Sequence, residues 1–334
     1  MNAHQTEPDK TSPQMYFFRR LQDQVPSNVL LAEAIARELR ISNDSAYRRL
    51  RGETSLTLDE ADKLSRHFGV PLQDGADWHN NTVAFNRYSV SATEHGFEKY
   101  LETSLSFFTA ISRGRDKSGI YAAKDIPVFY YFQFPLLARF KLLFWLRAHA
   151  TAEDSQHGNI TMRTIPEAYL KKGESIAEAY AQVPFTEIWN DETVNSTMRQ
   201  IHYYHEAGHF EHPDDARHLL QELDQLVCHV QEQAKQGVKL FRGHRCAPYH
   251  LYFNEVMLLD NTIHTVVDGV CTTFFSYNNI NYLRTADVRF GREIGQWLKE
   301  QLEKSTLLSL AGERDRNRLF KGVRRRIQEL QGKL

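Results

Sequence analysis

The stretch Ile35–Gly52, IARELRISNDSAYRRLRG, decides the fold of the N-terminal part of the chain. Its first half places apolar side chains on one helical face, and a short turn at residues 40–42 precedes a second helix. Ala36 is small enough to let two helices cross closely beside it, while Leu39 and Ile41 are placed to pack the turn. The spacing predicts two short helices joined by a tight turn.

The second of these helices would turn a polar face outward. Residues 40–51 carry four arginines against one acid, Asp44, so the local net charge is four minus one, or +3, in a chain whose overall net charge is −1. Arginine reads guanine or pairs with phosphate, and asparagine suits adenine, so this face has the chemistry of a DNA-reading helix. We predict the DNA-binding residues to be Ser42, Asn43, Asp44, Ser45, Tyr47, Arg48, Arg49 and Arg51.

Helix start and stop signals surround this stretch. Ser27 can cap the helix before it. Further on, the segment TLDE has the capping-box pattern, in which Thr57 and Glu60 satisfy each other's free backbone donors. Gly69 and Pro71 then end the helix. Because local signals and hydrophobic periodicity agree, three compact helices are expected here.

Residues 27–72 resemble the helix-turn-helix of phage-repressor (Cro-like, XRE-type) regulators. The family pattern is roughly L-A-x-x-L-G-hydrophobic-S-x-x-T/S-hydrophobic-x-R-x-x-x-G, and it is matched by Ile35, Ala36, Leu39, Ile41, Ser42, Ser45, Ala46, Arg48 and Gly52. The resemblance implies that the second helix enters the major groove of double-stranded DNA. Two positions depart from it. Arg40 stands where the family often has glycine and so must accept an unusual backbone angle, and Arg49 stands where many relatives have an apolar residue.

Length and composition are those of an ordinary globular protein. The chain has 334 residues, enough for two domains, with 41% apolar and 25% charged residues. The N-terminus lacks a signal-peptide pattern, and charged and polar residues interrupt the most apolar stretch, residues 128–146. Three widely spaced cysteines without a CxxC pair argue against a disulfide framework or a zinc knuckle. We expect a cytoplasmic protein with no membrane association.

The expected fold is mainly α. It combines an N-terminal helix-turn-helix bundle with a larger helical domain that contains a small antiparallel β-meander (α+β). The meander is predicted from three β-rich runs separated by Asp260-Asn261 and Asp268-Gly269, which suit hairpin turns. The expected segments are a disordered tail at 1–13, a helix-turn-helix DNA-binding domain at 14–72, a linker at 73–82, and a helical effector or dimerisation domain at 83–334 with the β-meander near 249–277.

Residues 205–209, HEAGH, match a zinc-peptidase pattern. On a helix, histidines four residues apart share a face and can hold zinc, with the glutamate as general base. Gly208 weakens such a helix, Pro213 follows closely, and no third ligand stands out at a suitable spacing. We predict no metal site and no cofactor, and keep a zinc-dependent metallopeptidase using His205 and His209 as an alternative.

Two further segments each allow more than one interpretation. Residues 120–146 are rich in aromatics and predict either core elements, which we favour, or the wall of a pocket for a small apolar or aromatic ligand. The C-terminal helix, residues 313–333, has eight basic side chains against three acidic ones, a net charge of +5. This surface would contact phosphate, dock an acidic partner or simply face solvent.

A second resemblance extends beyond the N-terminus. Residues 186–210, TEIWNDETVNSTMRQIHYYHEAGHF, and residues 305–320, STLLSLAGERDRNRLF, look similar to parts of uncharacterised helix-turn-helix proteins common in Bacteroidota. In that group a repressor-like N-terminus is joined to a long C-terminal region. The resemblance implies a regulator and brings no known ligand or reaction.

The sequence therefore predicts a sequence-specific DNA-binding transcriptional regulator and not an enzyme. A homodimer is expected, because a single helix-turn-helix contacts little DNA and two half-sites one helical turn apart would add affinity and specificity. The C-terminal domain would supply the dimer contact or sense a small-molecule effector of unknown identity. Besides the peptidase, a protein-interaction module with a repressor-like head stays open as an alternative.

Overall fold

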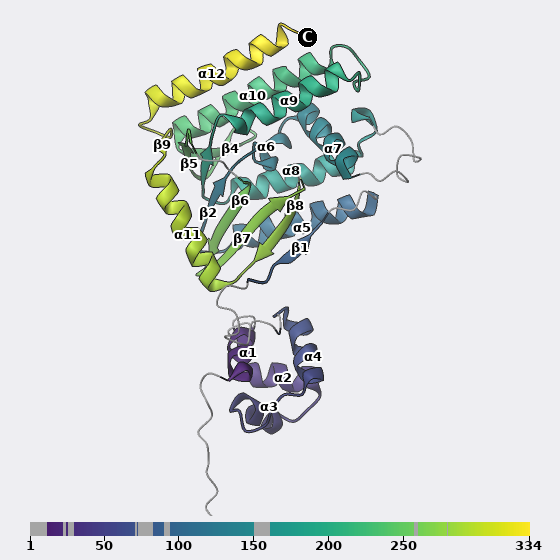
Figure 1. Ribbon diagram of the computed structural model, residues 1–334, viewed down its shortest axis with the longest axis vertical. Coiled ribbons are helices and arrows are strands. Elements are labelled where there is room, and N and C mark those ends of the chain that lie inside the picture. The colour runs from purple at the N-terminus through teal and green to yellow at the C-terminus, as the bar shows by residue number, and fades with distance from the viewer. Residues whose placement is uncertain are drawn as a thin grey trace, which may run out of the picture. The chain divides into compact units, whose positions relative to one another are not determined.

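The chain divides into two compact units, Met1–Ala84 and Phe85–Leu334. Figure 1 shows the computed structural model, which describes residues 12–22, 25, 30–70, 72, 83–89, 94–149, 161–256, 260–278 and 280–334. The predicted linker, Ser27 and Pro71 lie outside the described residues, as does the predicted disordered tail except for Ser12 and Pro13.

Four helices make up the described part of the N-terminal unit: α1 (Pro13–Gln22), α2 (Leu31–Leu39), α3 (Asn43–Leu50) and α4 (Leu58–Phe68). The predicted capping box is present, since the Thr57 hydroxyl accepts from the Glu60 N–H and the Glu60 carboxylate accepts from the Thr57 N–H. One apolar core joins the helices. Its buried side chains are Phe17, Phe18, Leu21, Val25, Leu31, Ala32, Ile35, Ala36, Ala46, Leu64 and Val70.

A mixed sheet of nine strands forms the centre of the described part of the C-terminal unit. The strand order is β1-β8-β7-β6-β2-β3-β5-β4, with β9 paired to β5; β3 runs parallel to both β2 and β5, and the other pairs are antiparallel. The prediction of a mainly helical domain with a small antiparallel meander is wrong. The strands are β1 (Asn86–Tyr88), β2 (Lys117–Ala122), β3 (Phe185–Trp189), β4 (Val238–Phe241), β5 (His244–Phe253), β6 (Thr262–Val267), β7 (Val270–Tyr277), β8 (Asn281–Thr285) and β9 (Thr306–Leu307).

The missed strands are short and pair over long distances in the sequence. β2 and β3 have six and five residues, too few for a clear alternation, and their parallel pairing needs no hairpin turn that a sequence could reveal. The predicted first strand of the meander belongs to β5, which pairs with β3, so Tyr249 lies opposite Phe185. The β6–β7 hairpin is confirmed. Asp268 and Gly269 have φ angles of 49° and 85°, as its tight turn requires.

Helices cover both faces of the sheet (Figure 1). α11 packs against β6 and β7 on one face, while α5 and α8 pack together on the other. No helix in the described ranges is long and apolar enough to span a membrane. The helices are α5 (Glu94–Arg113), α6 (Val128–Tyr131), α7 (Pro135–His149), α8 (Glu167–Ala181), α9 (Glu192–Glu206), α10 (Asp215–Gln236), α11 (Val288–Glu303) and α12 (Glu313–Gln331), with a 3-10 turn at Met162–Thr164.

Alternation along β2 assigns its side chains to the two faces. Ile120 packs with Leu298 of α11, whereas its neighbour Tyr121 joins the main core on the opposite face. Glycine lets α11 lie close to the sheet, because a Cβ at Gly295 would lie 3.0 Å from Nε2 of the buried His264. The sheet thus separates a thin apolar layer under α11 from a thick core under the remaining helices.

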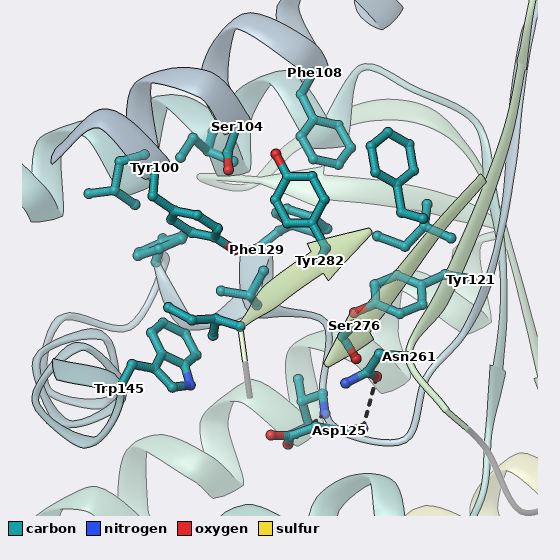
Figure 2. A pocket seen from close by; sticks show the side chains of 18 of the residues that line it. Tyr100, Ser104, Phe108, Tyr121, Asp125, Phe129, Trp145, Asn261, Ser276 and Tyr282 are labelled. Atoms are coloured by element: carbon teal, nitrogen blue, oxygen red, sulfur yellow. Dashed lines mark hydrogen bonds between the residues drawn. The ribbon is translucent and has the colours of Figure 1, made fainter. Parts of the chain in front are cut away.

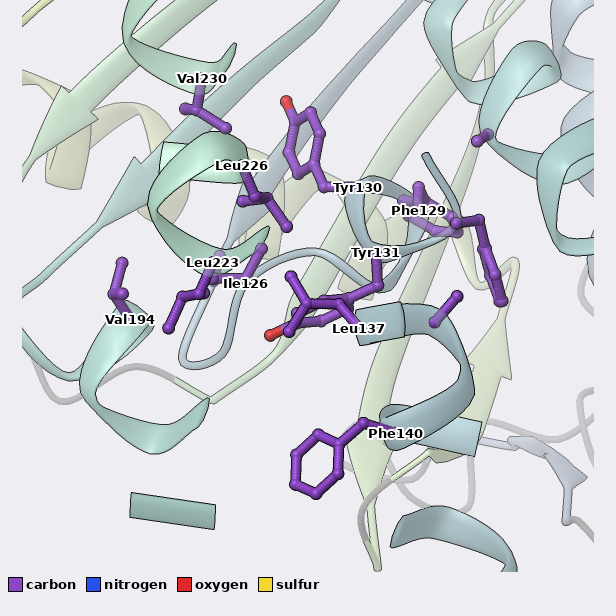
Figure 3. Close-up of a cluster of buried hydrophobic side chains, with 14 of the residues drawn as sticks. Ile126, Phe129, Tyr130, Tyr131, Leu137, Phe140, Val194, Leu223, Leu226 and Val230 are labelled. Carbon is purple, nitrogen blue, oxygen red and sulfur yellow. The ribbon is translucent and has the colours of Figure 1, made fainter. Parts of the chain in front are cut away.

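The thick core is built around α10. Figure 3 shows Leu223, Leu226 and Val230 of this helix facing Tyr130 and Tyr131 across the core. The buried residues of α10, which runs from Asp215 to Gln236, recur every three or four positions and so form one continuous apolar face.

The same core encloses a charged network. Glu187 is fully buried and accepts four hydrogen bonds from side chains of the surrounding elements. Lys239 is also buried, with its Nζ donating to the Tyr180 carbonyl at 3.0 Å, and burial holds its pKa well below the usual range, with Glu187 opposing that shift. The four donors to Glu187 are Tyr130 (2.8 Å), Tyr180 (2.6 Å), Trp189 (2.9 Å) and Tyr249 (3.0 Å).

Candidate nucleic-acid interface

The turn between α2 and α3 is built by backbone geometry at Arg40. This residue adopts the left-handed conformation, with φ 55° and ψ 46°, which is unusual for a residue that has a Cβ. Its N–H and that of Ile41 both donate to the carbonyl of Ala36, which closes the end of α2. The chain therefore leaves α2 in a fixed direction, and α3 begins three residues later.

Two of the predicted DNA-binding residues start α3. Ser42 is its N-cap, and the Ser42 hydroxyl accepts a hydrogen bond from the Ser45 N–H at 3.2 Å. The same hydroxyl donates to the Ser45 Oγ at 2.9 Å. Both serines thus fix the first turn of α3.

Five other predicted residues form an exposed face on and directly after α3. The side chains of Arg48 and Arg51 are 55% and 54% exposed, and Tyr47 is 42% exposed, which is high for a large aromatic ring. Asn43 and Asp44 are exposed in the first turn. We call this surface the α3 face; it consists of Asn43, Asp44, Tyr47, Arg48 and Arg51.

An acid that the sequence analysis passed over lies beside the α3 face. Glu53 accepts from Arg51 at 2.6 and 3.1 Å and lies 3.8 Å from Nε of Arg48. The Arg51 hydrogen bonds, against a smaller effect of burial, lower the pKa of Glu53. Across residues 40–60 four arginines face four acids, Asp44, Glu53, Asp59 and Glu60, so this longer stretch has a net charge of zero rather than the +3 counted for residues 40–51.

Arg49 is turned away from the α3 face. Its side chain is 15% exposed and forms a two-pronged ion pair with Glu60 of α4, with N–O distances of 2.7 and 3.2 Å. Burial raises the pKa of Glu60, but the hydrogen bonds from Arg49 and Thr57 outweigh it and leave that pKa lowered. Arg49 therefore braces α3 against α4.

A clamp from α1 holds the loop that follows α3. The amide nitrogen of Gln14 donates to the carbonyls of Arg49 and Thr54 at 2.8 and 2.9 Å. Its amide oxygen accepts from the Leu56 N–H at 2.8 Å. Sequence reasoning missed Gln14, because its partners lie 35 to 42 residues away and a single glutamine carries no pattern.

The HEAGH segment does not form a zinc-peptidase helix. α9 ends at Glu206, and Gly208 adopts a positive φ of 65°, so His205 and His209 are not on consecutive turns of one helix. His209 instead packs against the Tyr204 ring with 5.3 Å between ring centroids. Among the described residues no group of three or more His, Cys, Asp or Glu side chains is arranged to hold a metal ion. The end of α9 at Glu206 therefore separates the two histidines that the alternative metal site would use.

The arginines of α12 are largely engaged in ion pairs within the unit. Arg316 is buried and donates to the carbonyls of Leu308 and Leu310. Arg324 makes a two-pronged pair with Asp224 of α10, at 2.8 and 2.9 Å. The positive charge seen in the sequence therefore fixes α12 to the rest of the unit, which weakens its case as a second phosphate contact.

No protein-family model, curated protein or solved structure matches this chain. The likeness of residues 27–72 to phage-repressor regulators, and of the whole chain to Bacteroidota helix-turn-helix proteins, stays a prediction. The function must be inferred from the geometry of α3 and from the interior of the C-terminal unit.

Proposed function

We propose that this chain is a sequence-specific DNA-binding transcriptional regulator that reads double-stranded DNA with α3. The observation that carries the proposal is the α3 face itself, an exposed polar and aromatic surface on a helix that is capped at its start and braced from behind. A helix used only to complete a bundle has no need for an exposed tyrosine and two exposed arginines. Asn43 suits adenine, and Arg48 and Arg51 suit guanine or phosphate.

The arginines of the α3 face can exchange Glu53 for phosphate at small cost. Exposed ion pairs contribute on the order of 0–1 kcal/mol, whereas each phosphate contact also releases bound counterions from DNA. Binding should therefore weaken steeply as salt concentration rises. A dimer would double these contacts on a two-fold symmetric site, with half-sites about one helical turn apart.

The proposal is tested first by selection. The purified full chain is mixed with random duplexes at two salt concentrations, and the retained DNA is sequenced. Enrichment of a short two-fold symmetric sequence is expected at both. Weak salt-sensitive retention without enrichment would contradict sequence-specific reading by α3.

Point variants then assign the binding to α3. Arg48→Ala and Arg51→Ala are each expected to weaken binding to the selected site by about 1–3 kcal/mol, roughly 5- to 100-fold, measured by fluorescence anisotropy. Arg66→Ala is the matched control. It removes the same charge from an exposed position on α4 whose pairing is confined to Asp62, and affinity should change less than 2-fold, as expected for a contact outside the interface. Equal losses in all three variants would place the DNA elsewhere.

Glu53 favours a second candidate, a module that docks another protein. It pairs with both arginines of the α3 face and reduces the positive charge that DNA would need. Glu53→Gln separates the two functions. If α3 reads DNA, freeing both arginines should raise DNA affinity several-fold and steepen its salt dependence. If α3 docks protein, neither the wild-type chain nor the variant binds DNA.

A further inference from the structure

A cavity of about 140 Å³ lies inside the C-terminal unit, between the sheet and the helices that cover its thick core (Figure 2). Strands β2, β6, β7 and β8 form one wall, and α5, α6, α7 and α8 contribute to the other. The aromatic segment 120–146, which we expected to be core, supplies both buried core and eight of the residues that line this cavity. The cavity is made entirely of described residues.

Most of the cavity wall is aromatic. Rings from four different elements surround it, including Phe108 of α5, Phe129 of α6, Trp145 of α7 and Phe274 of β7. Phe108 meets Phe129 edge to face with 4.5 Å between ring centroids, which leaves ring faces and edges available to a planar guest. Such a wall favours an aromatic molecule over a flexible aliphatic one.

One end of the cavity carries polar groups that the fold itself does not use. Tyr121 is 5% exposed, and its hydroxyl makes no hydrogen bond within the described part of the chain; the same holds for the Ser276 hydroxyl. Figure 2 shows both hydroxyls on the same side of the cavity, near Asn261. Neither oxygen is among the fully enclosed side-chain atoms that lack a partner, so both open into the cavity, where a tyrosine offers a ligand a hydroxyl that phenylalanine would not.

Two amides at this end have one side engaged and one side free to donate. The Asn261 oxygen accepts from the backbone N–H groups of Lys124 and Asp125 at 2.9 and 3.2 Å, and the Gln200 oxygen accepts from Lys141 at 2.9 Å. Both NH₂ groups are left as donors toward the cavity. The polar end of the cavity therefore presents mainly hydrogen-bond donors to a ligand.

The charge at this end is balanced before any ligand binds. Asp125 contacts the cavity, and its Oδ2 lies 3.0 Å from Nζ of the fully buried Lys141. A carboxylate guest would meet the negative charge of Asp125, and an ammonium guest would find that charge already paired with Lys141. The pairing favours a guest without charge.

We propose that this cavity binds a small uncharged aromatic compound with one hydroxyl or similar polar group, of which phenol is the simplest. Its ring would lie among the aromatic side chains, and its polar group would meet Tyr121, Ser276 and Asn261. The volume sets the size, because apolar cavities of about 150 Å³ take up benzene. Binding itself does not depend on the proposed DNA function; the step from ligand to regulated DNA binding rests on it.

The test uses the full chain without DNA, titrated with four single-ring probes and followed by ligand-observed NMR and calorimetry. Phenol is expected to bind saturably with a Kd between about 10 µM and 1 mM, as suits about seven non-hydrogen atoms. Toluene should bind more weakly, and benzoate and benzylamine should not bind. Saturable binding of benzoate or benzylamine as tight as that of phenol would overturn the uncharged class, and no saturable binding of any probe would overturn the site.

Two variants and a control locate the binding. Tyr121→Phe removes only the unpartnered hydroxyl, so phenol affinity should fall roughly 3- to 10-fold while toluene affinity stays the same. Ile263→Phe places a ring in the cavity and should abolish binding of both probes. Thermal unfolding checks that this variant is folded, and Tyr121→Phe tests the site independently of it. Tyr203→Phe, on an exposed tyrosine outside the cavity, should change neither affinity. Unchanged binding in both cavity variants would place the ligand elsewhere.

A final measurement separates this proposal from the DNA function. DNA affinity of the full chain is measured with saturating phenol and without it. A change of at least 3-fold that is lost in Ile263→Phe would make the cavity a regulatory site. Ligand binding without any DNA binding would leave the cavity proposal standing and remove the proposed function.

Discussion

The two units of the chain handle charge in opposite ways. In the N-terminal unit the charged side chains of the α3 face lie at the surface, and Glu53 pairs with both Arg48 and Arg51 at exposures near one half. In the C-terminal unit Glu187, Lys141 and Lys239 are fully or almost fully buried inside networks of tyrosines and amides. One unit presents charge to the outside, and the other encloses it.

This difference has consequences for what each unit can do. Exposed pairs exchange partners cheaply, so the N-terminal unit suits a partner that brings its own charge, such as DNA. Buried charges are fixed in place by their hydrogen bonds and exclude further charge, so the C-terminal unit suits a neutral guest. Variants that change the charge or the backbone freedom of either unit test this difference.

The largest effect is expected from Glu187→Ala. The change leaves three tyrosine hydroxyls and one indole N–H without their acceptor and removes the carboxylate whose charge opposes the lowering of the Lys239 pKa. Removing one member of such a buried network should cost about 3–5 kcal/mol of the free energy of unfolding of the C-terminal unit. Denaturant unfolding followed by tryptophan fluorescence measures the loss. Glu178→Ala, at an exposed position of α8, should stay within about 0.5 kcal/mol of the wild type; an equal loss there would refute the buried-network account.

A smaller effect, seen through pH, is expected at His229 of α10. Burial lowers the pKa of this histidine to about 4, against a weaker opposing hydrogen bond with the backbone of Leu240. Between an unfolded-state pKa of about 6.5 and the folded value, the unfolded chain binds a proton that the folded chain refuses. The free energy of unfolding should therefore be highest above about pH 6.5 and fall by about 3 kcal/mol from this group as the pH drops toward 4.

Paired variants isolate the contribution of His229. His229→Gln should remove that part of the pH dependence, while His218→Gln, at an exposed position of the same helix, should keep it. Denaturant titrations at pH 7, 6, 5 and 4 give the slopes. Identical slopes in the two variants would mean that His229 titrates alike in the folded and unfolded chain.

Local signals explain why the N-terminal helices were predictable and the sheet was not. The capping box at Thr57 and the apolar spacing around Ile35 act over a few residues, and the structure contains both. The pairing of Tyr249 with Phe185 depends on a parallel register between segments 64 residues apart, counted from their numbers. Nothing in a short β-rich run specifies that partner, because the register is fixed by burial on both faces of the finished sheet.

The same division holds for the candidate sites. Exposure of the α3 face followed from helical spacing, but the inward turn of Arg49 depends on Glu60, eleven residues away. The aromatic residues of segment 120–146 were compatible with a pocket wall, but the sequence did not show whether they enclose a cavity. Tyr121 and Ser276 come together only when β2 and β7 take their places on either side of β6.

A moderate effect, confined to the N-terminal unit, is expected from Gln14→Ala. Three hydrogen bonds are lost, and two carbonyls and one N–H in a partly buried loop lose their partner. The free energy of unfolding of this unit should fall by about 1–2 kcal/mol, while the C-terminal unit is unchanged. Hydrogen exchange resolves the two units in one experiment. Equal loss in both units would show that they unfold together, and no loss would show that water replaces the clamp.

The smallest effect, and one of opposite sign, is expected from Arg40→Gly. Arg40 has a left-handed backbone at the end of α2, a conformation that strains any residue with a Cβ but not glycine. The substitution should raise the free energy of unfolding of the N-terminal unit by about 0.5–1 kcal/mol, less than the strain itself because glycine also gives the unfolded chain more freedom. Thermal unfolding should show a rise of a few degrees.

Arg37→Gly is the matched control, because it makes the same substitution but is expected to change the stability in the opposite direction. It replaces the same residue type three positions earlier, at an exposed site inside α2 where the backbone is helical, and should cost about 1 kcal/mol. Both variants remove one positive charge near α3, so an electrostatic origin would shift stability in the same direction in both. A gain in stability at Arg40 beside a loss at Arg37 would instead assign the effect to the backbone. It would mean that the turn leading into α3 is strained by the left-handed conformation of Arg40.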